Sequence, residues 1–113
     1  MINYEFIKND ERPDVGIVEL RGTLVEEPDQ RYLDLIGEYQ GKAVVLDLAK
    51  VNLMNSTGLT VIIGSYKRLR EGGNPRLVLC NVSEKIMRKL DATHLNEVLK
   101  TFDSLEEALD SLD

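Results

Sequence analysis

The sequence has little of what most catalytic and redox sites are built from. Its 113 residues include one cysteine, Cys80, and one histidine, His94. A lone cysteine excludes an internal disulfide, and its place in an apolar segment is typical of a small buried side chain. Because there is neither a Cys–His pair nor a Ser–His–Asp set, the sequence predicts no enzyme, no metal site and no cofactor.

Long hydrophobic stretches and positive charge are also scarce. A run of about 18 apolar residues, the length that could cross a bilayer, occurs nowhere, and segment 1–8 lacks the basic and apolar parts of a signal peptide. Fourteen Lys and Arg against 20 Asp and Glu give a net charge of −6. Such a surface repels phosphate backbones and anionic lipids. We therefore expect no membrane span, no direct nucleic-acid partner and a cytoplasmic location.

The overall composition is that of a globular protein. Apolar residues make up 42% and charged residues 30% of the chain, which excludes a disordered tail, a collagen-like repeat and a coiled coil. A chain of this length can bury roughly two-thirds of its surface, enough for a packed core without disulfides. We expect a single domain over residues 1–113.

Apolar patterning predicts the element order β-β-α-β-α-β-α-β-α. The expected strands lie at 4–8, 15–20, 43–48, 76–80 and 98–102, and the expected helices at about 28–39, 56–71, 84–91 and 103–112. A tight turn with Pro13 makes the first two strands an antiparallel hairpin, and three strand-helix-strand crossovers demand parallel pairing. The predicted fold is α/β: a mixed, mostly parallel sheet with an antiparallel N-terminal edge strand and about four helices.

Helix-capping residues support this order. Ser83 is expected to cap the third helix, and segment 103–106 matches a capping box. His94 follows the third helix and is expected in a left-handed turn.

Small polar residues separate the central strand from the second helix, after a loop expected at 49–54. Asn55, Ser56 and Thr57 can cap free helix amides there, and Gly58 allows another chain or a ligand to approach the backbone. The junction lies at the carboxyl edge of the sheet, where α/β folds usually place their sites. The alternative is a purely structural N-cap, which the spacing alone favours.

This junction also carries a resemblance to a known family. The segments Met54-Asn-Ser-Thr-Gly-Leu59 and Val61-Ile-Ile-Gly-Ser-Tyr-Lys67 closely resemble the anti-sigma factor antagonists, whose domain is named STAS after sulfate transporters and these antagonists. The likeness extends from Leu20-Arg-Gly-Thr-Leu24 through Val82-Ser-Glu-Lys-Ile86 to Phe102-Asp-Ser-Leu-Glu-Glu-Ala-Leu109, nearly the whole chain.

The resemblance implies a phosphorylation site. In that family the serine of an Asp-Ser-Ser/Thr-Gly motif is phosphorylated by an anti-sigma factor that is also a serine kinase, and Ser56 is the matching position. The unphosphorylated antagonist binds the anti-sigma factor and frees the sigma factor, phosphorylation breaks that complex, and a serine phosphatase resets it. A weak homodimer is a further state to consider.

Residues around Ser56 are expected to form the partner-binding surface. On the second helix, Thr57, Thr60 and Gly64 form a stripe of small residues, and the alternative for Gly64 is packing near a neighbouring strand. Gly22 and Thr23 resemble the loop that joins the same surface in relatives, although Gly22 could equally be a turn residue.

Asn55 departs from the family pattern, because aspartate is usual at this position. Asparagine caps a helix about as well, but it adds no negative charge beside the Ser56 hydroxyl. The alternative function is therefore a non-phosphorylated STAS subunit of a transport or stress-signalling assembly, which uses the same face for binding only.

A receiver domain is the remaining alternative, because Asp47 follows an apolar strand and Asp10 and Glu11 form an acidic pair. That fold needs a full helix between its first two strands, and the three residues before Val15 cannot provide one. Asp47 has no second carboxylate with which to share a metal, so we expect it to accept hydrogen bonds or cap.

Overall fold

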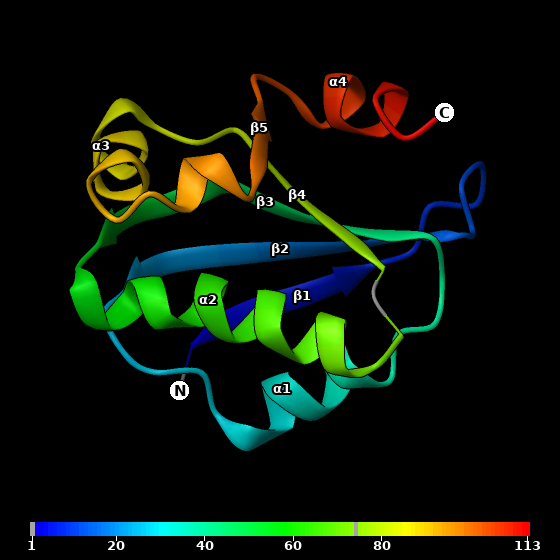
Figure 1. The fold of residues 1–113 in the computed structure, drawn as a ribbon, viewed down its shortest axis with the longest axis horizontal. Helices are drawn as coiled ribbons and strands as arrows, with labels where there is room; N and C mark the ends of the chain where they lie inside the picture. Colours follow the sequence, from blue (N-terminus) through cyan, green and yellow to red (C-terminus); the bar gives the residue numbers. More distant parts are fainter. Residues whose placement is uncertain (1, 74) are drawn as a thin grey trace.

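A computed structural model describes residues 2–73 and 75–113, and it shows one five-stranded sheet with helices on both faces (Figure 1). The elements in chain order are β1 (Asn3–Ile7), β2 (Val15–Leu24), α1 (Gln30–Gly37), β3 (Ala43–Met54), α2 (Ser56–Glu71), β4 (Arg76–Cys80), α3 (Glu84–Ala92), the 3-10 helix η1 (Leu95–Glu97), β5 (Lys100–Phe102) and α4 (Leu105–Asp110).

The strands lie side by side in the order in which they occur in the chain. β1 pairs with β2 antiparallel, with Ile7 opposite Ile17, and β2, β3, β4 and β5 are parallel neighbours. The predicted hairpin, the three crossovers and the mixed α/β sheet are confirmed.

Two apolar layers hold the helices against the sheet. The continuous apolar run at the start of β3 is buried on both faces, as expected for a central parallel strand. The layer under α1, α2 and α3 is built from Val18, Leu20, Tyr32, Ile36, Val44, Leu46, Leu59, Ile62, Leu69, Leu77, Leu79, Ile86 and Leu90. The smaller layer under α4 is built from Val15, Ala43, Val45, Val78, Cys80, Ala108 and Leu112.

The prediction of a loop at 49–54 is wrong, because β3 continues through these residues to Met54. β2 is also longer than predicted and supplies a partner: Arg21 pairs with Lys50 and Leu24 with Met54. Two register shifts interrupt this pairing and break the two-residue alternation from which a strand is recognised in sequence.

The remaining differences concern the ends of elements. α1 begins later than predicted, because the Asp29 carboxylate caps it and accepts a hydrogen bond from the Tyr32 amide at 2.9 Å. β5 begins only at Lys100, after η1. Ser83 is confirmed as the N-cap of α3, whereas the N-cap of α4 is Ser104, one residue later than the predicted capping box.

His94 has the expected left-handed backbone, with φ of 62°. Asn81 also has a positive φ, 56°, which the sequence did not indicate. Both residues follow a regular element, where the chain must change direction.

Candidate functional site

β2 and β3 end together beside the start of α2. Gly22 pairs with Val51 and Thr23 with Leu53, and the Asn55 amide donates a hydrogen bond to the Leu24 carbonyl at 3.3 Å. The pairing therefore places Gly22 and Thr23 on the strand next to the one that leads into α2. Figure 1 shows α2 leaving this edge of the sheet from the end of β3.

Asn55 holds the first turn of α2. Its backbone is extended, with φ −108° and ψ −174°, and its side-chain oxygen accepts a hydrogen bond from the Gly58 amide at 2.8 Å. Its carbonyl accepts the first helical hydrogen bond, from the Leu59 amide at 3.0 Å. The predicted N-cap is therefore present, with asparagine in place of aspartate.

Ser56 is the first residue of α2 and is exposed. Within residues 2–73 and 75–113 its hydroxyl has no hydrogen-bond partner. The free amides at a helix N-terminus create a positive local potential that favours an anion. The hydroxyl is thus open to another protein and lies where a negative group would be tolerated.

Gly58 is buried against the chain itself. A Cβ at this position would collide with the Leu24 carbonyl oxygen, so only glycine lets the start of α2 lie so close to the end of β2. The close contact with Leu24 therefore explains why position 58 is a glycine.

Gly22 lies within β2 and not in a turn. Its φ is +74°, a left-handed conformation that favours glycine, and an added Cβ would meet open space. It sits at the register shift before Thr23, which is exposed. Glycine is needed here for backbone conformation.

The stripe of small residues on α2 divides into two parts. Thr57 is exposed near Ser56, and the Thr60 hydroxyl donates a hydrogen bond to the Thr57 carbonyl. Gly64, further along α2, lies next to α1: a Cβ there would be 3.3 Å from Pro28 Cγ and 3.4 Å from Leu33 Cδ2. Gly64 thus packs against α1 and the segment before it, not against a strand.

A buried hydrogen bond fixes α2 on α1. The Tyr32 and Ser65 hydroxyls lie 2.6 Å apart, and Ser65 also donates to the Val61 carbonyl at 2.7 Å. Burial raises the pKa of the Tyr32 hydroxyl, which therefore stays protonated. Apolar periodicity does not reveal a buried serine, so this pair could not be predicted from the sequence.

Asp47 accepts hydrogen bonds, as expected. Its Oδ1 accepts from the Ala49 amide and from Asn81 Nδ2, both at 3.0 Å.

Burial, and secondarily the Asp47 charge, raise the pKa of the neighbouring Cys80 thiol to about 12. Among the described residues, no group of three or more His, Cys, Asp and Glu side chains is placed to hold a metal ion.

A charged network joins β1, β2 and β3 and is not apparent from the sequence. Arg21 binds Glu19 at 2.8 Å and Glu5 at 3.0 Å, and Lys50 binds Glu19 at 3.1 Å. Hydrogen bonds from Arg21 and Lys50 lower the pKa of Glu19. Glu19 and Arg21 are neighbours on one face of β2, and the register of the sheet brings Glu5 of β1 and Lys50 of β3 to them.

Comparisons with known proteins show the family to which this chain is similar. The STAS domain family model matches residues 6–108. An anti-sigma F factor antagonist of Paenibacillus polymyxa is 31% identical over 80 residues, which cover 71% of this chain and 68% of that protein. An anti-sigma-B factor antagonist of Listeria monocytogenes is 34% identical over 61 residues, 54% of this chain and only 53% of that protein, so the match spans about half of its length.

Solved structures show the same fold at lower identity. An anti-sigma factor antagonist from Mycobacterium paratuberculosis superposes with a TM-score of 0.77 at 19% identity, covering 99% of this chain and 94% of that one. The Bacillus cell fate determinant SpoIIAA in its phosphorylated form gives a TM-score of 0.63 at 16% identity, with 100% of both chains covered.

The described residues contain no helix long and apolar enough to span a membrane. The family model covers most of the chain, and the mixed α/β fold agrees with that of the solved structures. The chain belongs to the STAS domain family, as its resemblance to the anti-sigma factor antagonists predicted.

Proposed function

We propose that this chain is an anti-sigma factor antagonist whose binding is switched by phosphorylation of Ser56. Unphosphorylated, it binds an anti-sigma factor that is also a serine kinase, and so releases a sigma factor in the cytoplasm. A serine phosphatase restores the binding form. The observation that carries the proposal is the exposed Ser56 hydroxyl at the capped start of α2, beside the edge that carries Gly22 and Thr23.

The same edge is the proposed partner-binding surface. Thr23, Asn55, Ser56 and Thr57 are exposed there, and Thr60 lies one turn further along α2. Gly22 and Gly58 shape this surface through the backbone, and partner contact at Gly64 remains a prediction.

Phosphorylation would act on the complex more than on the fold. A phosphoserine adds about −1.5 to −2 charges, which a partner surface fitted to a hydroxyl meets with repulsion and a desolvation cost. Within the monomer, the start of α2 favours an anion by about 0.3–1 kcal/mol. The free protein should therefore keep its structure while its complex dissociates.

The test is to incubate the protein with ATP and the candidate anti-sigma factor kinase, and to locate the phosphate by mass spectrometry. We expect one added phosphoryl group, at Ser56, and none in the Ser56→Ala variant. Thr57→Ala is the matched comparison for the position of the phosphate, because it removes the neighbouring exposed hydroxyl and its product should still carry the phosphoryl group, at Ser56. Phosphate on Thr57 alone, or on neither residue, contradicts the proposal.

Binding provides the second half of the test. Isothermal titration of the anti-sigma factor should give a complex with the wild type and with Ser56→Ala, and a complex at least about tenfold weaker with Ser56→Glu. If Ser56→Glu binds as tightly as the wild type, the switch does not act at this residue.

The second candidate function is a non-phosphorylated subunit of a transport or stress-signalling assembly. Asn55 favours it, because the cap carries no negative charge beside the Ser56 hydroxyl. Co-purification with an ATPase, together with the absence of phosphate in protein isolated from its source cells, would support this alternative.

A further inference from the structure

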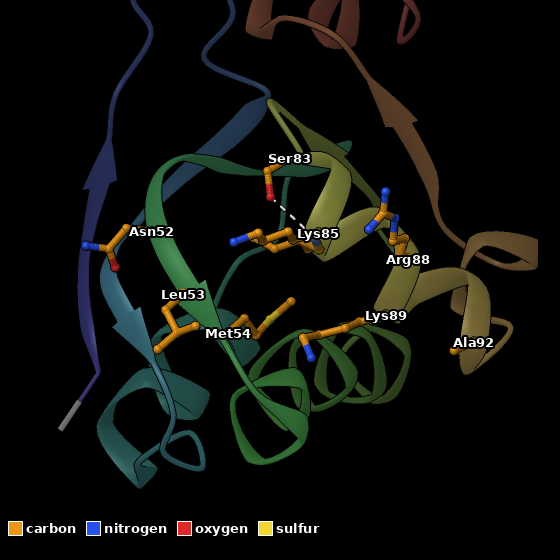
Figure 2. A pocket seen from close by; sticks show the side chains of 9 residues that line it. Asn52, Leu53, Met54, Ser83, Lys85, Arg88, Lys89 and Ala92 are labelled. Atoms are coloured by element: carbon orange, nitrogen blue, oxygen red, sulfur yellow. Dashed lines mark hydrogen bonds between the residues drawn. The ribbon is translucent and has the colours of Figure 1, made fainter.

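A groove lies between the end of β3 and helix α3, next to the Ser56 edge. It encloses about 400 Å³, and residues 52–54 form one wall and α3 the other (Figure 2). Met54 belongs to this wall and precedes Ser56 by two residues. The groove is therefore continuous with the proposed partner-binding surface.

The charged side chains that line the groove are all positive. Lys85, Arg88 and Lys89 line it, and no aspartate or glutamate does. Figure 2 shows Lys85 and Lys89 reaching from α3 toward the end of β3, with Arg88 on the outer side of the helix. In the described part of the chain none of the three forms a salt bridge. Two unpaired lysines that reach toward the end of β3, with Arg88 near them on the same helix, favour an acidic ligand although the chain has a net charge of −6.

The wall formed by β3 presents two apolar residues, Leu53 and Met54, next to Asn52. The Leu53 side chain is 55% exposed at this wall, although large aliphatic side chains usually lie inside, while Met54 and Ile86 are buried beneath. Leu53 pairs with Thr23, so its exposed surface joins the groove to the second strand of the partner-binding edge. An occupant that covers Leu53 would remove this apolar surface from water.

We propose that the groove binds an acidic, amphipathic segment of the protein partner that docks on the Ser56 edge. Apolar side chains of the segment cover Leu53, and its carboxylates pair with Lys85 and Lys89. The identity of the partner rests on the proposed function, whereas the groove's preference for an acidic amphipathic segment rests only on these residues.

The first experiment tests the groove without the partner. The probe is a fluorescein-labelled peptide of about 16 residues, long enough to form a helix, with leucines along one face and glutamates beside them. Its matched control replaces each glutamate with glutamine. Fluorescence anisotropy measures binding of each peptide to the full chain at low and high salt. We expect the acidic peptide to bind at least about tenfold more tightly than the glutamine peptide, and to weaken as salt rises.

Charge reversal locates the binding. Lys85→Glu and Lys89→Glu should each weaken the acidic peptide about tenfold, whereas Lys85→Arg should retain its binding. Lys42→Glu is the matched control, because Lys42 is exposed just before β3, at the opposite end of that strand, and the substitution changes the net charge equally. It should weaken binding less than about twofold. Thermal melting verifies that each variant is folded.

Two outcomes overturn the inference. Equal binding of the two peptides would mean that the groove selects apolar surface alone. Equal losses in Lys42→Glu and Lys85→Glu would mean that only the net charge matters.

The second experiment separates this inference from the proposed function. If the anti-sigma factor kinase phosphorylates Ser56 but binds Lys85→Glu as tightly as the wild type, the groove inference fails and the proposed function stands. If the acidic peptide binds as expected while no anti-sigma factor does, the groove stands and the proposed function fails.

Discussion

The side-chain oxygen of Asn55 accepts a hydrogen bond from the backbone amide of Gly58 at 2.8 Å. This bond fixes the first turn of α2 and with it the position of Ser56. The two residues lie on either side of the proposed phosphorylation site. Gly58 is also held against the Leu24 carbonyl, so contacts within the chain fix this turn.

The Asn55 cap should be measurable as stability. Asn55→Ala should lower the free energy of unfolding by about 1 kcal/mol, because the Gly58 amide loses its acceptor. Asn55→Asp should retain the wild-type value within about 0.5 kcal/mol, since aspartate caps equally well. Urea denaturation measures both variants, with the exposed Ser56→Ala as control. If Asn55→Asp were as unstable as Asn55→Ala, helix capping would not explain the contribution of Asn55 to stability.

The two glycines of α2 should respond oppositely to alanine. Gly58→Ala should cost about 3 kcal/mol or more, because its Cβ collides with the backbone of Leu24. Gly64→Ala should be neutral or stabilise by up to about 1 kcal/mol, because helix propensity improves and the neighbouring Pro28 and Leu33 atoms belong to side chains. Thermal melting compares the two variants.

A larger residue at position 64 separates packing from partner contact. Gly64→Leu should lower the melting temperature, because its side chain meets Pro28 and Leu33. An unchanged melting temperature together with weaker partner binding would instead assign Gly64 to the partner surface.

The Glu19 network should make stability depend on acidic pH. Hydrogen bonds from Arg21 and Lys50 lower the pKa of Glu19 in the folded protein below 4.5, its ordinary value. The unfolded state therefore binds the proton more readily, so the stabilisation is fully present above pH 4.5 and is lost as the pH falls through the folded pKa. Unfolding free energies of wild type and Glu19→Gln, measured from pH 3 to 7, should differ by a constant amount near neutrality and converge in acid. A difference independent of pH would contradict this network.

Cys80 should be unreactive in the native protein. Burial raises the pKa of its thiol to about 12, and the side chain is fully buried. Because the thiolate is the nucleophile, a disulfide reagent such as Ellman's reagent at pH 8 should label it only after unfolding in denaturant. Rapid labelling of the folded chain would show that β4 opens locally near its end.

Much of the fold followed from the sequence, because its elements carry strong local signals. The apolar run at the start of β3, the short turn with Pro13 between β1 and β2, and the Ser83 cap of α3 each depend on a few adjacent residues. The Ser56 junction was found in the same way, since small polar residues after a buried strand mark the end of the sheet and the start of a helix.

Other features were decided only by contacts between distant segments. β3 runs on to Met54 because β2 lies beside it, and two register shifts hide that pairing from any periodic pattern. The Tyr32–Ser65 bond needs α1 to lie on α2, and the groove needs α3 to stand beside residues 52–54. Local sequence indicates which segments form strands and helices, because apolar periodicity and capping residues are patterns among neighbours in the chain. Polar pairs such as Tyr32–Ser65 and Glu19–Lys50 need the tertiary structure, because their partners lie tens of residues apart in the chain and meet only when packing brings them together.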